Sequence, residues 1–176
     1  KEMRLLLALL FLSVSIHTLG AQSCDAFIEE NKTINGTQIL KTGSVSLVIR
    51  ANYMYNLGFS VDERGVMAMV SSKGGEPLNQ GDEVIFMDNN KIRKTYRFVD
   101  MSEMTKQGDI PIYQNLLQLD MAALEWMAGS SINTIYLKNN TSHQIRKFTI
   151  TSNRVREFRN LAICVKKTLD PESVND

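Results

Sequence analysis

The sequence is poor in the residues that build most catalytic and metal centres. Its 176 residues include two histidines and two cysteines, and His17 lies inside an apolar segment near the start. A zinc site needs three or four His, Cys, Asp or Glu ligands, and no such grouping occurs at helical or ribbon spacing. The serine-nucleophile pattern G-x-S-x-G and glycine-rich phosphate loops are also missing. We therefore expect no metal, no cofactor and no enzymatic activity.

Long apolar runs and linkers are scarce as well. The one long apolar run begins at Leu5 and is shorter than the roughly 20 residues that a membrane-spanning helix needs. No repeat or Pro/Gly/Ser linker divides the remainder, and the 43% hydrophobic and 22% charged residues of the full sequence are ordinary globular values. The sequence predicts a single globular domain over residues 22–176, with a short polar C-terminal tail and no membrane span.

Residues 1–21 have the pattern of a secretory signal peptide. Lys1 and Arg4 supply the positive end, the run from Leu5 to Val14 is apolar, and the segment closes on the small residues Gly20 and Ala21. Cleavage after Ala21 is therefore expected. We expect the protein to be secreted, into a periplasm or the extracellular space, and the signal favours a bacterial envelope.

Export to an oxidising compartment would allow the two cysteines to form a disulfide. Cys24 and Cys164 are the only pair, and an oxidising compartment allows such a pair to persist as a disulfide. Closing a loop of about 140 residues would stabilise the fold by up to about 4–5 kcal/mol on the chain-entropy model. The alternative is a lipid anchor on Cys24, although Gln22 fits lipoprotein processing poorly. The sequence favours the disulfide.

The turn residues that separate short apolar segments predict an α+β fold with a mainly antiparallel sheet. In residues 59–70, a polar turn ending at Gly65 separates two apolar runs, as in a β-hairpin. Residues 84–98 repeat the pattern with Asn89 and Asn90 at the tip, and residues 132–150 form a third example. Successive hairpins of this kind are typical of a meander. Residues 46–58 fit either a strand or a helix.

Two helices complete the prediction. Asp120 can cap a short helix near 120–128 that Gly129 ends, and Asn153 can cap a longer helix that continues to about Leu169. In the second helix, apolar residues recur at the spacing of one face, so we expect this amphipathic C-terminal helix to pack on the sheet. The stripe consists of Val155, Phe158, Ala162 and Val165.

Charge is distributed unevenly along the chain. From residue 131 to 168 eight Lys or Arg residues face one acid, Glu157, whereas residues 22–90 carry five basic and nine acidic residues. We interpret the basic excess as a surface for an anionic partner, such as an envelope polysaccharide, a lipid head group or an acidic protein. Its expected residues are Arg146, Lys147, Arg154, Arg156 and Arg159. Two alternatives stay open, namely pairing between the two halves and simple solvation.

Nucleic acid is not an expected partner, because the single Trp126 and the scattered tyrosines form no stacking platform among the basic residues. The sequence is therefore interpreted as an exported, non-enzymatic binding or interaction module of the cell envelope. The alternative is a small glycosidase-like hydrolase, since that reaction needs only two suitably spaced carboxylates. The candidate carboxylates are Asp82, Glu83, Asp100, Glu103 and Asp109.

Overall fold

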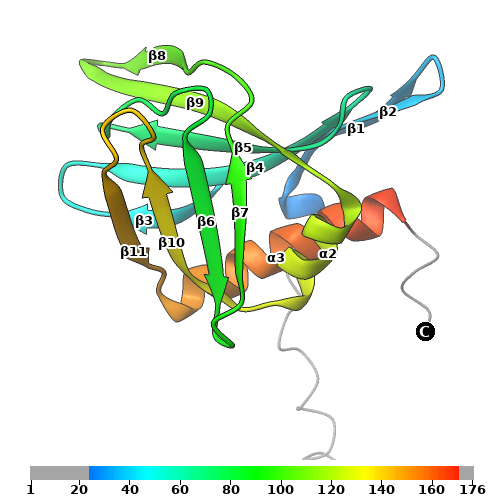
Figure 1. Ribbon diagram of the computed structural model, residues 1–176. Helices are drawn as coiled ribbons and strands as arrows, with labels where there is room; N and C mark the ends of the chain where they lie inside the picture. The colour runs from blue at the N-terminus through cyan, green and yellow to red at the C-terminus, as the bar shows by residue number, and fades with distance from the viewer. Residues whose placement is uncertain (1–23, 171–176) are drawn as a thin grey trace, which may run out of the picture.

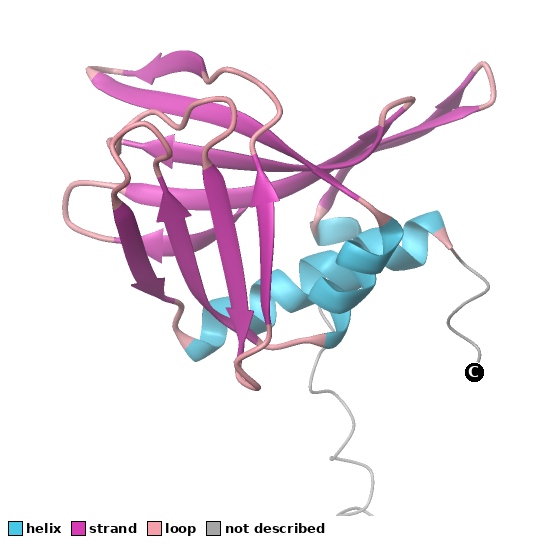
Figure 2. Cartoon of the chain, in the orientation of Figure 1, coloured by secondary structure: helices cyan, strands magenta, loops and turns pink. Residues whose placement is uncertain are grey.

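The computed structural model describes residues 24–170, which form two antiparallel sheets and two α-helices (Figure 1; Figure 2). The α+β class with sheets built from hairpins is confirmed. The predicted signal peptide and nearly all of the predicted polar tail lie outside the described residues.

The larger sheet has seven strands. Along the main path their order is β1-β2-β4-β5-β9-β8, and β3 pairs with β4 beside that path. A short 3-10 turn, η1 (Cys24–Ala26), precedes it. The strands are β1 (Ile28–Ile34), β2 (Thr37–Thr42), β3 (Val45–Ile49), β4 (Met54–Asp62), β5 (Gly65–Lys73), β8 (Glu103–Gln107) and β9 (Ile110–Leu119).

The smaller sheet has four strands in the order β11-β10-β6-β7. They are β6 (Glu83–Asp88), β7 (Arg93–Arg97), β10 (Ile132–Lys138) and β11 (Ile145–Thr149). A single bridge between Phe98 and Leu117 connects the end of β7 to β9 of the larger sheet. In Figure 1 the smaller sheet faces the viewer, and no helix or strand is drawn in front of it.

All three predicted hairpins are confirmed, as β4–β5, β6–β7 and β10–β11. Gly65 has a φ of 100°, which suits its place at the end of the first turn. In the second turn the left-handed residue is Lys91, with a φ of 66°, rather than Asn89 or Asn90. Asp88 stabilises that turn because its carboxylate accepts a hydrogen bond from the backbone N–H of Ile92 at 3.0 Å.

Residues 46–58, which fit either a strand or a helix by sequence, lie in two strands joined by a loop at residues 50–53. They cover most of β3 and the first part of β4, which pair with each other as an antiparallel hairpin. A bulge between Ser46 and Val48 interrupts the pairing of β3 with β4, and the adjacent residues Leu47 and Val48 are both buried. This irregularity hides the alternation that identifies a half-exposed strand.

The two helices are α2 (Met121–Gly129) and α3 (Ser152–Leu169), and they pack against each other. The predicted cap of α2 is confirmed, since the Asp120 carboxylate accepts a hydrogen bond from the N–H of Ala123 at 2.6 Å. The predicted cap of α3 at Asn153 is wrong. Thr151 is the N-cap, and its carbonyl accepts hydrogen bonds from the N–H groups of Arg154 and Val155. Thr151, Ser152 and Asn153 all have capping side chains, so local preference could not separate them.

Phe158 of α3 lies where the two sheets meet. Its ring stacks on Phe59 of β4 at a centroid distance of 6.4 Å and on Phe86 of β6 at 6.1 Å. The two sheets also contact directly, because the rings of Tyr55 and Phe148 are 5.3 Å apart. The predicted apolar stripe of α3 is therefore confirmed as core, with Val155 only partly buried.

A disulfide joins the start of the described chain to α3. Cys24 and Cys164 are bonded, with their Cα atoms 5.3 Å apart and 140 positions between them in sequence. This confirms the predicted pairing, and the Cα distance lies in the ordinary range. Since Cys24 is bonded to Cys164, its sulfur is not free to carry a lipid in this state.

Candidate functional site

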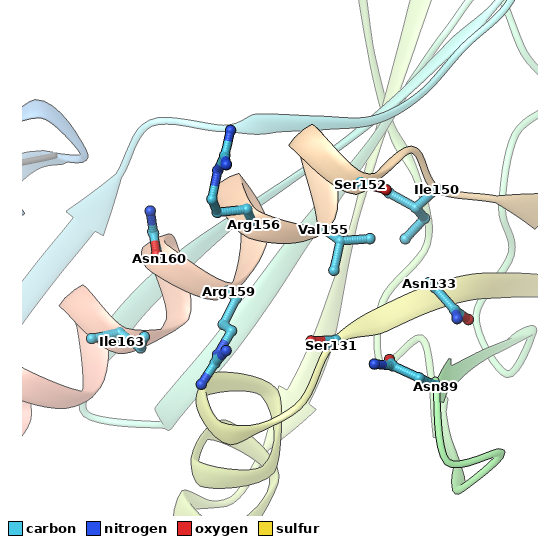
Figure 3. Close-up of a pocket in the computed structure, with 10 residues that line it drawn as sticks. All are labelled: Asn89, Ser131, Asn133, Ile150, Ser152, Val155, Arg156, Arg159, Asn160 and Ile163. Carbon is cyan, nitrogen blue, oxygen red and sulfur yellow. The ribbon is translucent and has the colours of Figure 1, made fainter. Parts of the chain in front are cut away.

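An open groove lies between the first half of α3 and the adjacent end of the four-stranded sheet (Figure 3). Its volume is about 660 Å³. Ten residues from four separate parts of the chain line it, and they are mostly amides, hydroxyls and apolar side chains with two arginines among them. The lining consists of Asn89, Ser131, Asn133, Ile150, Ser152, Val155, Arg156, Arg159, Asn160 and Ile163.

Backbone hydrogen bonds fix the sheet side of the groove. The N–H of Asn89 donates to the carbonyl of Ser131 at 3.2 Å, which ties the β6–β7 turn to the segment before β10. The N–H of Ile150 donates to the carbonyl of Asn133 at 2.8 Å, which holds the β11–α3 connection against β10. Because these backbone positions are paired, the side chains of Asn89 and Asn133 are presented from a fixed frame, close to each other in Figure 3.

Arg159 connects the groove to the end of α2. Its Nε donates a hydrogen bond to the carbonyl of Ala128 at 3.0 Å, and Figure 3 shows the side chain directed towards α2. The last carbonyls of a helix carry partial negative charge, so a guanidinium is favoured there. That contact uses one of the five N–H donors of a guanidinium. The positive charge of Arg159 remains at the groove.

Arg156 leaves the preceding turn of α3 in a different direction. One terminal nitrogen donates to the side-chain oxygen of Asn153 at 3.3 Å, and the guanidinium is directed away from α2 (Figure 3). The two arginines therefore both line the groove but diverge at their tips. An anion of some length can contact both, whereas a single small ion would contact one.

Neither groove arginine is neutralised by a carboxylate within residues 24–170. No Asp or Glu of that range lies within 4.0 Å of the charged nitrogens of Arg156 or Arg159. The groove lining itself contains no carboxylate either. The groove is therefore a concave site with a net positive charge.

The structure separates the other three predicted cations from this pair. Arg146 on β11 forms an ion pair with Glu76 at 3.1 Å, so the first alternative, pairing between the halves, applies to this residue. Lys147 lies over the ring of Tyr136, with its nitrogen 5.9 Å from the centroid. Arg154 donates a hydrogen bond to the carbonyl of Ser46 at 3.4 Å. Of the five predicted residues, only Arg156 and Arg159 line the groove.

The neutral polar residues of the groove were not predicted from sequence. Asn89 had been assigned only to a turn, and Asn133 and Ser131 had no distinguishing pattern. These residues meet because β6 and β10 are neighbours in one antiparallel register, where Asp88 pairs with Ile132. A long-range register of this kind leaves no local signal in the sequence.

The carboxylates considered for a hydrolase lie outside the groove. Asp82 is buried and accepts hydrogen bonds from the backbone N–H groups of Asn79 and Asn140, both at 2.9 Å. Asp100 accepts from the N–H of Leu116 at 2.8 Å. Glu103 and Asp109 are exposed, at β8 and the turn after it. Among residues 24–170 no group of three or more His, Cys, Asp or Glu side chains is placed to hold a metal ion.

Glu83 differs from the other carboxylates because two cations contact it. A hydrogen bond from Lys138 at 2.9 Å, and a second from Arg97 at 3.1 Å, lower the pKa of its carboxyl below the usual value. Glu83 is therefore a charged partner for two neighbouring cations and is poorly suited to carry a proton at neutral pH.

Comparison of the chain with known protein families, with curated proteins and with solved structures found no match. Within residues 24–170, neither α-helix has the length and apolar character needed to cross a membrane.

Proposed function

We propose that this protein is an exported, non-enzymatic binding module whose groove beside α3 holds an anionic ligand. The ligand belongs to one of three classes found at cell envelopes, namely an acidic polysaccharide, an anionic lipid head group or an acidic protein. The observation that carries the proposal is the presence, in one concave site of about 660 Å³, of two arginines that have no carboxylate partner within residues 24–170.

The fold supports this proposal through the placement of its charges. Arg146 and Lys138 form ion pairs with Glu76 and Glu83, so part of the basic excess is neutralised within the domain. Arg156 and Arg159 have only neutral contacts among the described residues. A guanidinium presents its donors in a planar fork that matches carboxylate, sulfate and phosphate groups. The groove thus offers two anion-recognition groups along its α3 side.

Binding is favoured over catalysis by the kind of side chains in the groove. Its ten lining residues are amides, hydroxyls, aliphatic groups and arginines. General acid–base catalysis needs a group that can gain and lose a proton near neutral pH, such as a histidine or a perturbed carboxyl. None of the ten described lining residues is of that kind. They can orient a ligand by hydrogen bonds and charge.

Export is supported by the disulfide. A bond between Cys24 and Cys164 persists in an oxidising compartment and is rare where glutathione keeps thiols reduced. The same bond argues against a lipid anchor on Cys24, because the sulfur of Cys24 is already bonded to Cys164.

The test is a binding assay with three immobilised probes: polygalacturonate, phosphatidylglycerol vesicles and polyglutamate. The wild-type protein should bind at least one of them, and binding should weaken between 0.1 M and 1 M salt, as the screening length falls from about 10 Å to about 3 Å. The double variant Arg156→Gln/Arg159→Gln should lose roughly tenfold or more in affinity, equivalent to about 1.4 kcal/mol.

A matched control removes two positive charges elsewhere. Lys41 on β2 and Lys106 on β8 are exposed and belong to the other sheet. The variant Lys41→Gln/Lys106→Gln should bind as the wild type does. Equal binding by the groove variant and the wild type would contradict the proposal, as would equal losses in the groove variant and the control.

A further inference from the structure

The outer face of the four-stranded sheet carries a second group of cations, gathered on one aromatic ring. Tyr136 lies on β10 and points away from the core, since its neighbours Ile135 and Leu137 are buried. The guanidinium of Arg93 lies 5.6 Å from the centroid of the Tyr136 ring, and the ammonium of Lys147 lies 5.9 Å from it. Arg93 comes from β7 and Lys147 from β11, the two edge strands of the sheet.

Strand register accounts for this convergence. Tyr136 pairs with Lys147 on one side and with Ile85 on the other. Arg93 pairs with Met87, and its Nε lies 3.4 Å from the Met87 sulfur, so the arginine side chain extends across β6 towards Tyr136. This placement also covers Met87, which is buried although it lies on the outer face of the sheet.

The two cations on Tyr136 differ from their neighbours in having no carboxylate partner within residues 24–170. Arg97 and Lys138, farther along the same face, share the carboxylate of Glu83. Arg93 and Lys147 are held instead by the face of the ring, which attracts a cation without cancelling its charge. Two like charges repel each other when they are drawn to one ring, and an anion placed between them removes that cost.

The groove lies at one end of this sheet. Near that end, Thr134 pairs with Met87 and with Thr149 in one row across β6, β10 and β11. The pair of Ile132 with Asp88 lies one step farther towards the end. The groove residues Asn133 and Ile150 each lie one position beyond that row in sequence. At about 3.3 Å per residue, the distance along β10 from Asn133 to Tyr136 is about 10 Å. One extended ligand can therefore contact the groove and the cations on Tyr136.

We propose that Arg93 and Lys147, held on the ring of Tyr136, form a second anion subsite continuous with the groove, and that the ligand is an extended acidic polysaccharide. This inference rests on the proposed function of the groove and assigns its ligand class. The repeated negative charges of such a polymer match two separated positive positions, one at Arg156 and Arg159 and the other at Tyr136.

The lining between the two positive positions favours sugar over lipid or peptide. Asn89, Asn133 and Ser131 offer side chains that both donate and accept hydrogen bonds, as the hydroxyl groups of sugar rings require. A membrane surface would need apolar side chains projecting from a convex face, whereas this site is a groove beside a sheet face. On the outer face the central strands β6 and β10 have both edges already paired, so a peptide strand could add only at the edge strands β7 and β11 and not over Tyr136.

The test compares galacturonate oligomers of two lengths, a trimer and a decamer, by calorimetry. The wild type should bind the decamer at least tenfold more tightly than the trimer. Arg93→Gln/Lys147→Gln should remove this gain from chain length and leave trimer affinity within about twofold of wild type. Arg156→Gln/Arg159→Gln should weaken both oligomers. The methyl-esterified decamer, which has the same rings without charge, should bind to none of the proteins.

Two controls distinguish charge from structure. Arg93→Lys/Lys147→Arg keeps both cations and should keep the gain from chain length, and melting temperatures of all variants should be compared to confirm folding. Lys41→Gln/Lys106→Gln, which removes the same charge from the other sheet, should also keep the gain.

Failure of the second subsite and failure of the proposed groove function would give different results. If Arg93→Gln/Lys147→Gln retains the gain from chain length while the groove variant loses affinity, the second subsite is wrong and the groove function stands. If the groove variant binds both oligomers as the wild type does, the proposed function is wrong. If polyglutamate shows the gain from chain length and the galacturonate decamer does not, the assignment to polysaccharide is overturned.

Discussion

The two halves of α3 belong to one helix but have different surroundings. In the second half, Leu161, Ala162 and Val165 are fully buried and Cys164 is bonded to Cys24. The first half buries Phe158 in the core, but it also presents Arg156 and Arg159 to the groove, with neutral partners only among the described residues. The comparison teaches that a single helix can be joined covalently to the rest of the domain at one end and offer a binding surface at the other. Substitutions of the buried residues should therefore affect stability, and substitutions of the two arginines should affect binding.

The largest effect is expected from removing the disulfide. The variant Cys24→Ala/Cys164→Ala should be less stable by up to about 4–5 kcal/mol on the chain-entropy model, because the loop it opens spans almost the whole domain. For a protein of this size the melting temperature should fall by roughly 10–20 °C, measured by differential scanning calorimetry. Reduction of the wild-type protein should lower it in the same direction. An unchanged melting temperature would show that the disulfide in the second half of α3 does not stabilise the fold.

A somewhat smaller loss of stability is expected from a substitution on the core face of the same half of α3. Leu161→Ala should reduce the free energy of unfolding by about 2–5 kcal/mol, since it leaves a cavity where a fully buried side chain packed. Ile163→Ala is the matched control, because Ile163 is only partly buried and lines the groove. Urea denaturation should show a clearly larger change for Leu161. Equal losses would mean that the two faces of the helix are not distinguished energetically.

Arg159→Gln should have a modest effect on stability. The variant loses the hydrogen bond to the carbonyl of Ala128 at the end of α2, which should cost about 0.5–1.5 kcal/mol. Because α2 and α3 pack against each other, the loss should appear as faster hydrogen exchange at the last turn of α2. Unchanged exchange there would show that the contact with α2 does not hold Arg159 in place.

The smallest effect is expected from Arg156→Gln. Arg156 is exposed, and its guanidinium donates a hydrogen bond to the side chain of Asn153. The free energy of unfolding should change by no more than about 0.5 kcal/mol, measured by the same denaturation experiment. A loss comparable to that of Leu161→Ala would place Arg156 among the residues that hold the fold and would erase the contrast between the two halves.

Local features of the sequence predicted much of the fold. The hairpins were predictable because their turn residues and alternating strands lie close together in the chain, as at Gly65. The helix at residues 121–129 was predictable from its cap at Asp120. The disulfide followed from a count of two cysteines in a chain that the sequence predicts to be exported. The cap of α3 was missed because three adjacent residues compete for that position.

The groove could be predicted only in part. Arg156 and Arg159 stood out by charge, but charge alone could not separate them from the other three predicted residues, Arg146, Lys147 and Arg154. The structure divides them, since Arg146 pairs with Glu76. Arg93 and Tyr136 were missed as a site because their meeting depends on the register of β6, β7 and β10. Long-range pairing decides these contacts, and no neighbouring residues encode it.

The bond between Cys24 and Cys164 also determines what a protease can do to this molecule. Its two ends enclose all eleven strands and α2, so a single cut in any exposed turn between them produces two segments that stay covalently joined. The nicked and the intact protein then have nearly the same mass on a non-reducing gel and differ only after reduction. A cleavage site at the β6–β7 turn or the β10–β11 turn would thus leave the groove with all its residues on one covalent assembly.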